Sequence, residues 1–170
     1  MVMNKSLRTI IVWSVLGCIL AGMPTTAQAQ KVVFPQQKQA GVATLKCNAK
    51  NFTLANSLLQ APYSVVNGTL RFNGCKAMDL MPSADLFRIG LADRTEFSSQ
   101  DMKLASVTTE NYAADPKAAK GSERFRGKGV KAVFTRGDLR VEWRAVLRDG
   151  SHYLRTEMSI SSGKDVRMDH

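Results

Sequence analysis

Apolar and polar residues alternate over residues 139–148 of the chain, with Val146 as the exception. The odd positions are occupied by Leu139, Val141, Trp143, Ala145 and Leu147, and charged side chains fill most of the even ones. A period of two is typical of a β-strand with one face toward a core and the other toward water. The pattern therefore predicts a strand over residues 139–148, with Trp143 in the core.

The neighbouring segments predict two antiparallel partners for this strand. Residues 130–135 are apolar and extended, and the turn residues around Gly137 join them to the strand. A second turn at Gly150 precedes residues 154–160, in which Leu154, Met158 and Ile160 share one face. The chain is therefore expected to close with a three-stranded meander.

Earlier segments also favour β-structure. Asn67-Gly68 lies between two short apolar alternations and predicts a hairpin. Residues 86–91 and 102–107 predict further strands, whereas residues 108–121 indicate either a surface loop or a single helical turn. Short strands without a long helical period predict an all-β fold, an antiparallel β-sandwich.

The first 29 residues have the three parts of a secretory signal peptide. Lys5 and Arg8 give a charged start, residues 9–23 are apolar, and Ala27-Gln28-Ala29 has small residues at both ends. We therefore expect cleavage after residue 29 and a secreted or periplasmic protein. Residues 30–40 are polar and predict a linker or a short first strand. The sandwich domain is then expected over residues 41–170, with a possible truncation at its C-terminus.

Two alternatives to cleavage after Ala29 remain open. One is a retained membrane anchor, although the apolar run of about fifteen residues is shorter than the roughly twenty needed to span a bilayer. The other is lipid attachment at Cys18, because Val15-Leu16-Gly17-Cys18 loosely resembles a bacterial lipobox. The apolar run continues past Cys18, which favours cleavage after Ala29. No transmembrane span is expected once the signal peptide is removed.

Cleavage would leave two cysteines, Cys47 and Cys75. Only one pairing is then available, and exported proteins fold in an oxidising compartment. We therefore predict a disulfide that closes a loop of about 28 residues and stabilises the domain by roughly 3 to 4 kcal/mol. Two buried free thiols are the alternative. The chain has no CxxC motif and only two histidines, so we expect no metal site and no cofactor.

Composition and charge narrow the class of partner. The apolar and charged fractions are those of an ordinary globular protein, but the formal net charge is +10. A basic stretch with interspersed phenylalanines either binds a polyanion, such as an acidic glycan or an anionic membrane surface, or is a solvated face that keeps the protein soluble. Nucleic acid is not expected, because no recognition motif accompanies the stretch. The candidate polyanion-binding residues are Lys117, Lys120, Arg124, Arg126, Lys128 and Lys131.

No catalytic residue is assigned from the sequence. Glu142 and Glu157 could meet the carboxylate spacing of a glycoside hydrolase, about 5 to 9.5 Å, but each has a basic neighbour that keeps it ionised. Ser151 and His152 follow a turn glycine without a nucleophile-elbow motif, so turn chemistry explains them.

The segment from Trp143 to Glu157 follows the pattern W-x-A-x-L-R-D-G-S-x-Y-x-R-x-E. It resembles part of large secreted glycoside-hydrolase-like proteins that are described as alpha-galactosidase-like or as enterotoxins. In that family the segment belongs to an N-terminal β-supersandwich similar in fold to galactose mutarotase. A (β/α)8 barrel follows and carries the catalytic acids. Residues 86–89 and 99–102 fit the same region.

The resemblance implies a galactose mutarotase-like supersandwich that is incomplete here, because the chain ends before a barrel could begin. It implies a non-catalytic N-terminal module or fragment of a carbohydrate-active protein, whose partner is carbohydrate or a downstream catalytic barrel. A stand-alone exported β-sandwich that binds an acidic glycan or another polyanion is the alternative. A small independent enzyme is the third hypothesis.

Overall fold

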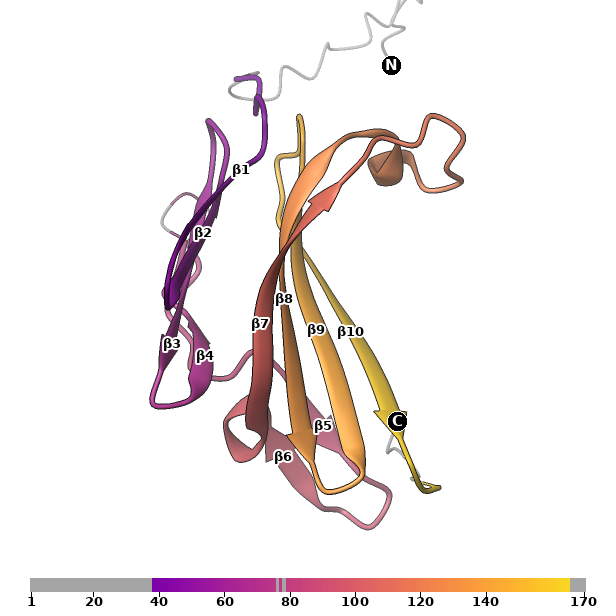
Figure 1. The fold of residues 1–170 in the computed structure, drawn as a ribbon. Helices are drawn as coiled ribbons and strands as arrows, with labels where there is room; N and C mark the ends of the chain where they lie inside the picture. The colour runs from indigo at the N-terminus through magenta and orange to yellow at the C-terminus, as the bar shows by residue number, and fades with distance from the viewer. Residues whose placement is uncertain (1–37, 76, 78, 166–170) are drawn as a thin grey trace, which may run out of the picture. The chain divides into compact units, whose positions relative to one another are not determined.

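The structure is a computed structural model that describes residues 38–75, 77 and 79–165. One sheet contains β1 (Thr44–Asn48), β2 (Asn51–Ala55), β3 (Gln60–Val66) and β4 (Thr69–Phe72) in that order. The other has the order β10-β9-β8-β7 and contains β7 (Lys103–Tyr112), β8 (Gly127–Arg136), β9 (Leu139–Arg148) and β10 (Arg155–Ser162). All pairings are antiparallel, and the two sheets face each other (Figure 1). The predicted all-β sandwich is therefore confirmed.

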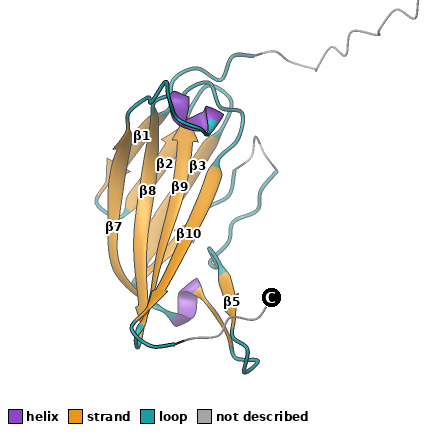
Figure 2. Ribbon diagram, turned by 90° about the vertical axis from the view of Figure 1, so that its right-hand side faces the viewer, coloured by secondary structure: helices purple, strands orange, loops and turns teal. Residues whose placement is uncertain are grey.

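Smaller elements complete the domain. A hairpin of β5 (Arg88–Gly90) and β6 (Glu96–Ser98) lies at one end of the sandwich, followed by the 3-10 turn η2 (Ser99–Asp101) (Figure 2). A second 3-10 turn, η3 (Gly121–Arg124), lies in the connection from β7 to β8. Helical structure in the described residues is limited to such short turns, as expected for an all-β chain.

The core lies between the sheets and is built from the alternating positions. Phe134 of β8, Trp143 of β9 and Leu54 of β2 are all buried in one hydrophobic cluster. The Tyr63 ring of β3 meets the Trp143 ring edge-on, with the ring centroids 5.5 Å apart. Aromatic pairs of this geometry contribute about 0.5–1.5 kcal/mol beyond their burial, so this contact helps to join the two sheets.

The closing meander has the predicted register. Trp143 lies opposite Ala132 on β8 and Met158 on β10, so all three side chains point to the core side. The Asn67-Gly68 turn also has the predicted role, since it joins β3 to β4. Both turn residues have positive φ, 51° and 75°, which is the conformation that type I′ hairpin turns require.

Other elements differ from the sequence-based expectation. β1 and β2 were not predicted, because Lys46, Asn48 and Asn51 interrupt the apolar alternation of two short strands, of which β1 lies at the edge of the sheet. β7 extends through Tyr112, although residues 108–112 were assigned to a weak loop segment. The pairing of these polar residues with β8 stabilises a strand that their own composition does not favour.

The predicted Cys47–Cys75 disulfide is wrong, because both cysteines are free thiols in the structure. Cys47 lies on β1, opposite Phe52, whereas Cys75 follows β4 at the other side of the four-stranded sheet. Three strand spacings of about 4.8 Å separate β1 from β4. That separation exceeds the roughly 7 Å Cα–Cα limit for a disulfide. Cys47 is exposed and Cys75 is buried, so only the second fits the free-thiol alternative.

Several expectations concern residues outside the described part of the chain. The signal peptide, its cleavage after Ala29, lipid attachment at Cys18 and most of the 30–40 linker belong to this group. Lys38 to Ala40, the described end of that linker, are not part of a strand. Within the described residues, no helix has the length and apolar character needed to cross a membrane.

Candidate functional site

The outward side of β7–β10 carries a network of ion pairs, which we call the charged face. The Lys131 Nζ lies 4.0 Å from Glu110 Oε1 and 3.4 Å from Glu142 Oε2. Arg144 contacts the same two carboxylates at 3.7 and 3.4 Å. Arg140 adds a 2.9 Å contact to Glu142 Oε1. The two carboxylates are thus shared among basic side chains of β8 and β9.

This arrangement does not provide acid catalysis. The hydrogen bond from Arg140, and after it that from Lys131, holds the pKa of Glu142 below its usual range. Glu157 is paired with Arg155 on the same strand. A glycoside hydrolase needs one carboxyl group with a raised pKa that remains protonated near neutral pH. Glu142 has the opposite shift, as its basic neighbours in the sequence indicated.

A tyrosine and a glycine complete the charged face. A Cβ on Gly129 of β8 would lie 2.8 Å from the Tyr112 ring of β7, so only glycine admits this close approach. The Tyr112 hydroxyl donates a hydrogen bond to Glu110, and the Arg148 guanidinium lies 4.6 Å from the ring centroid. Burial, followed by the bond to Glu110, raises the pKa of Tyr112. The phenol therefore stays neutral and takes a structural role.

The structure separates the candidate polyanion-binding residues. Lys117, Lys120 and Arg124 lie in the connection from β7 to β8, near one end of the sandwich. Lys128 and Lys131 are three residues apart on β8, so they point to opposite faces of the sheet. The six residues are therefore not all on one face of the sheet.

Four of these basic side chains also contact acidic or carbonyl groups of the same chain. Lys120 lies 3.6 Å from the Glu123 carboxylate, and Arg126 lies 3.5 Å from that of Asp149. Arg124 donates to the Ala118 carbonyl at 3.0 Å, and Lys128 donates to the Asn111 side chain at 2.6 Å. The two ion pairs are exposed and individually weak, and they partly neutralise Lys120 and Arg126. Arg124 and Lys128 contact neutral oxygens and keep their charge.

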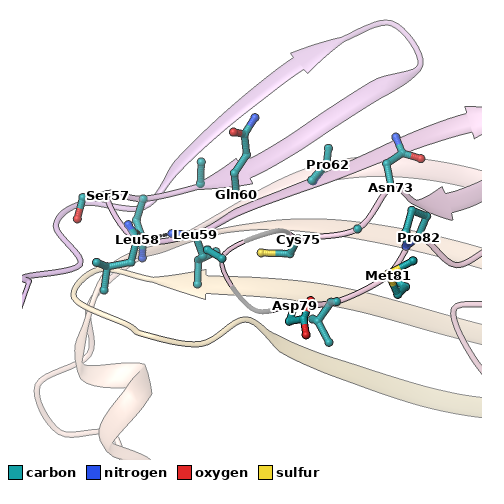
Figure 3. A pocket seen from close by; sticks show the side chains of 15 residues that line it. Ser57, Leu58, Leu59, Gln60, Pro62, Asn73, Cys75, Asp79, Met81 and Pro82 are labelled. Carbon is teal, nitrogen blue, oxygen red and sulfur yellow. Dashed lines mark hydrogen bonds between the residues drawn. The ribbon is translucent and has the colours of Figure 1, made fainter. Parts of the chain in front are cut away.

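A groove of about 710 Å³ lies between the start of β3 and residues 73–75, 77 and 79–82 (Figure 3). The turn before β3 is fixed by Asn56, whose Oδ1 accepts hydrogen bonds from the Leu58 and Leu59 amides at 2.9 and 3.0 Å. Its Nδ2 donates to the Ser151 carbonyl at 2.8 Å. This residue therefore ties one end of the groove to the β9–β10 turn.

The groove opens where the β3–β4 pairing stops. The backbone N–H of Asn73 donates a hydrogen bond to the Pro62 carbonyl at 2.8 Å, but Pro62 has no N–H that could donate to the Asn73 carbonyl. Gly74, with φ of 87°, then turns the chain away, and Cys75 exchanges backbone hydrogen bonds of 2.9 and 3.1 Å with Leu80. Because hydrogen-bonded pairs alternate along an antiparallel ladder, Gln60 would pair next with Cys75. That pair does not form, so the Gln60 backbone N–H and C=O face the groove.

The groove has polar groups on both sides. Gln60 and Asn73 lie on the β3 side, while Asp79 and Met81 lie on the opposite side, as Figure 3 shows. The Asn73 Oδ1 accepts a 3.1 Å hydrogen bond from Ser64. Leu58, Pro62, Pro82 and the exposed Met81 supply apolar surface between these groups. The lining therefore combines amides, one carboxylate and short apolar contacts.

A second cavity, of about 250 Å³, lies beside the aromatic core. Its lining includes Tyr63, Phe72, Trp143, Leu86 and Leu154. Trp143 is only 3% exposed, which confirms its predicted place in the core and means that it offers no open platform for stacking a sugar. Burial raises the pKa of Tyr63, so its hydroxyl is neutral.

The turn residues Ser151 and His152 do not form a nucleophile and base. The Ser151 Oγ donates to the Tyr153 carbonyl at 2.8 Å, whereas the His152 Nε2 lies 3.3 Å from the Lys38 carbonyl. Their turn role is confirmed. In the described residues, no group of three or more His, Cys, Asp or Glu side chains is arranged to hold a metal ion.

The groove was not predicted from the sequence. Its signals were a proline inside a predicted strand and a glycine two residues after the next strand. Both residue types can interrupt a strand ladder, but neither indicates that the segment after the glycine lines a groove. Comparisons with protein-family models, with curated proteins and with solved structures found no match to this chain.

Proposed function

We propose that the chain is a non-catalytic β-sandwich module that binds a neutral carbohydrate in the groove beside β3. The observation that carries this proposal is the set of hydrogen-bonding groups at Gln60, Asn73 and Asp79. Amide groups both donate and accept hydrogen bonds, and a carboxylate accepts them, which suits the hydroxyl groups of a sugar. The Gln60 backbone adds a further donor and acceptor.

The charge of the described groove lining favours a neutral ligand over an acidic one. Asp79 is the charged side chain among its described lining residues, and no lysine or arginine is among them. The candidate basic residues lie outside the groove lining, and four of them contact other groups of the same chain. An acidic glycan in the groove would meet the Asp79 carboxylate, and the described lining residues include no cation that would offset the repulsion.

The wider setting of the module rests on the resemblance of its closing strands. We propose a galactose mutarotase-like supersandwich of a secreted or periplasmic, alpha-galactosidase-like protein, with a catalytic barrel as partner. Sequencing the DNA beyond codon 170 tests this setting. A coding continuation with alternating strands and helices supports it, and an unrelated intergenic region contradicts it.

Glycan binding is best tested with a glycan array, followed by calorimetric titration of the neutral oligosaccharides that bind. The informative variants are Gln60→Ala and Asp79→Asn, and Gln39→Ala is the matched control because Gln39 is exposed and is not part of the groove lining. Losing one or two hydrogen bonds of about 1 kcal/mol each should weaken binding roughly five- to thirty-fold.

Two outcomes contradict the neutral-carbohydrate proposal. One is the absence of binding to any neutral glycan, and the other is an equal effect of Gln60→Ala and Gln39→Ala. Retention of acidic glycans at about 0.15 M salt, abolished by neutralising Lys117 and Lys120, supports the polyanion-binding alternative instead.

A further inference from the structure

The outer edge of β10 is a candidate for strand pairing. Residues Arg155–Ser162 pair with β9 on one side, and no described strand pairs with the other side. An unpaired edge presents backbone N–H and C=O groups that can accept another strand. Proteins usually protect such edges by short length, bulges, proline, coverage or inward-pointing charge.

The other sheet edges in the described structure have such protection. β1 is short and carries Lys46, and β4 is covered at Phe72 by a bridge to Ser83. β7 has a register shift between Leu104 and Ser106, which marks a bulge. β10, by contrast, has eight residues in unbroken register with β9 and contains no proline.

The side chains of β10 also lack an inward charge. Thr156, Met158 and Ile160 point to the core side, and Met158 is still 44% exposed. The charged residues Arg155 and Glu157 point outward and form an ion pair with each other. The edge therefore offers partly uncovered apolar side chains and no unpaired charge to repel an approaching strand.

We propose that β10 pairs antiparallel with β10 of a second copy of this chain, about a twofold axis at Ser159. This register places Met158 opposite Ile160 of the second copy on the core side, twice in the dimer. On the outward side it places Glu157 opposite Ser161 of the second copy. Each charged side chain thus faces an uncharged residue, so the register is complementary to itself, as a twofold interface requires. The two β7–β10 sheets become one continuous sheet.

Sedimentation velocity over a range of concentrations tests the association, using the protein as the cell produces it in buffer with about 0.15 M salt. A dimer in equilibrium with monomer is expected. Met158→Lys places an inward-pointing charge on the edge and should weaken the dimer at least about tenfold. Met81→Lys is the matched control, because Met81 is 79% exposed and lies outside β10. Circular dichroism verifies that each variant keeps its sheet content.

Cysteine crosslinking tests the register. In a Cys47→Ser background, which removes the exposed native thiol, Ser159→Cys should form an intermolecular disulfide under mild oxidation. Residues opposite each other in an antiparallel pair have Cα atoms about 4.5 to 5.5 Å apart, which suits a disulfide. Ser161→Cys should not crosslink, because the two copies of residue 161 are separated by about 13 Å along the strands.

Three results overturn the proposal. The first is a protein that remains monomeric at the highest concentration reached. The second is a dimer that Met158→Lys and Met81→Lys affect equally. The third is crosslinking of Ser161→Cys that matches or exceeds that of Ser159→Cys.

Discussion

Replacing Trp143 with alanine tests whether the core contact between the two sheets has the importance that its geometry indicates. Trp143 lies on β9, is 3% exposed and contacts Tyr63 of the opposite sheet at a centroid distance of 5.5 Å. The Tyr63 ring in turn lies 5.4 Å from Phe72. The indole therefore begins a chain of aromatic contacts that crosses the core.

The expected cost is large relative to the stability of a small domain. Truncating a buried tryptophan to alanine destabilises a protein by about 3–5 kcal/mol. The edge-on contact with Tyr63 contributes about 0.5–1.5 kcal/mol of that loss. Because Trp143 also lines the existing cavity of about 250 Å³, its removal enlarges that cavity, and the cost of a truncation increases with the volume left empty. We therefore expect the upper half of this range, against a total stability of about 5–15 kcal/mol.

Urea unfolding followed by far-ultraviolet circular dichroism measures this difference in the free energy of unfolding. Tyr153→Ala is the matched control, since Tyr153 is an aromatic residue that is 54% exposed and should change stability by less than about 0.5 kcal/mol. A double-mutant cycle with Tyr63→Leu isolates the ring contact. A loss below about 1.5 kcal/mol for Trp143→Ala, or one equal to that of the control, would refute the reasoning.

Three further predictions follow from single residues. Because the pKa of Glu142 is lowered in the folded state, its ion pairs stabilise the protein at pH values above the unfolded-state pKa. This contribution is lost as the pH falls through the lower folded-state pKa. Glu142→Gln should therefore flatten the acid limb of a curve of unfolding free energy against pH. Gly74→Ala should destabilise the fold by about 1–3 kcal/mol in thermal unfolding, because Gly74 has φ of 87° and a Cβ there would lie 2.9 Å from the Leu80 carbonyl oxygen. A thiol reagent should modify Cys47 in the native protein and Cys75 only after denaturation, and rapid native labelling of both thiols would contradict the burial of Cys75.

The part of the fold that the sequence predicted is the part in which local pattern and tertiary environment agree. β9 has a buried face and a mostly charged face, so its residues alternate with Val146 as the exception, and its register follows from this pattern. The β3–β4 turn is likewise determined locally, because Asn67 and Gly68 both tolerate the positive φ that the turn needs.

The elements that were missed depend on partners rather than on their own residues. β1 is largely exposed and is stabilised by its register with β2, and the polar half of β7 is stabilised by β8. The disulfide prediction failed for a related reason. It used the number of cysteines and the expected compartment, whereas the distance between Cys47 and Cys75 depends on the order of strands in a sheet, which spacing along the chain does not determine.

Both candidate surfaces arise where a strand ladder ends, but the surroundings of the unpaired backbone differ. At Gln60 the ladder stops because the chain turns away at Gly74, and the exposed backbone groups face a groove that Asp79 and Met81 line on the opposite side. Along β10 no described strand lies beyond the edge, so a second extended strand can reach it. The two proposed functions therefore depend on different residues. Gln60→Ala should weaken glycan binding without changing the sedimentation of the protein, and Met158→Lys should do the reverse. If both variants impaired both properties, the effects would come from the stability of the sandwich rather than from either surface.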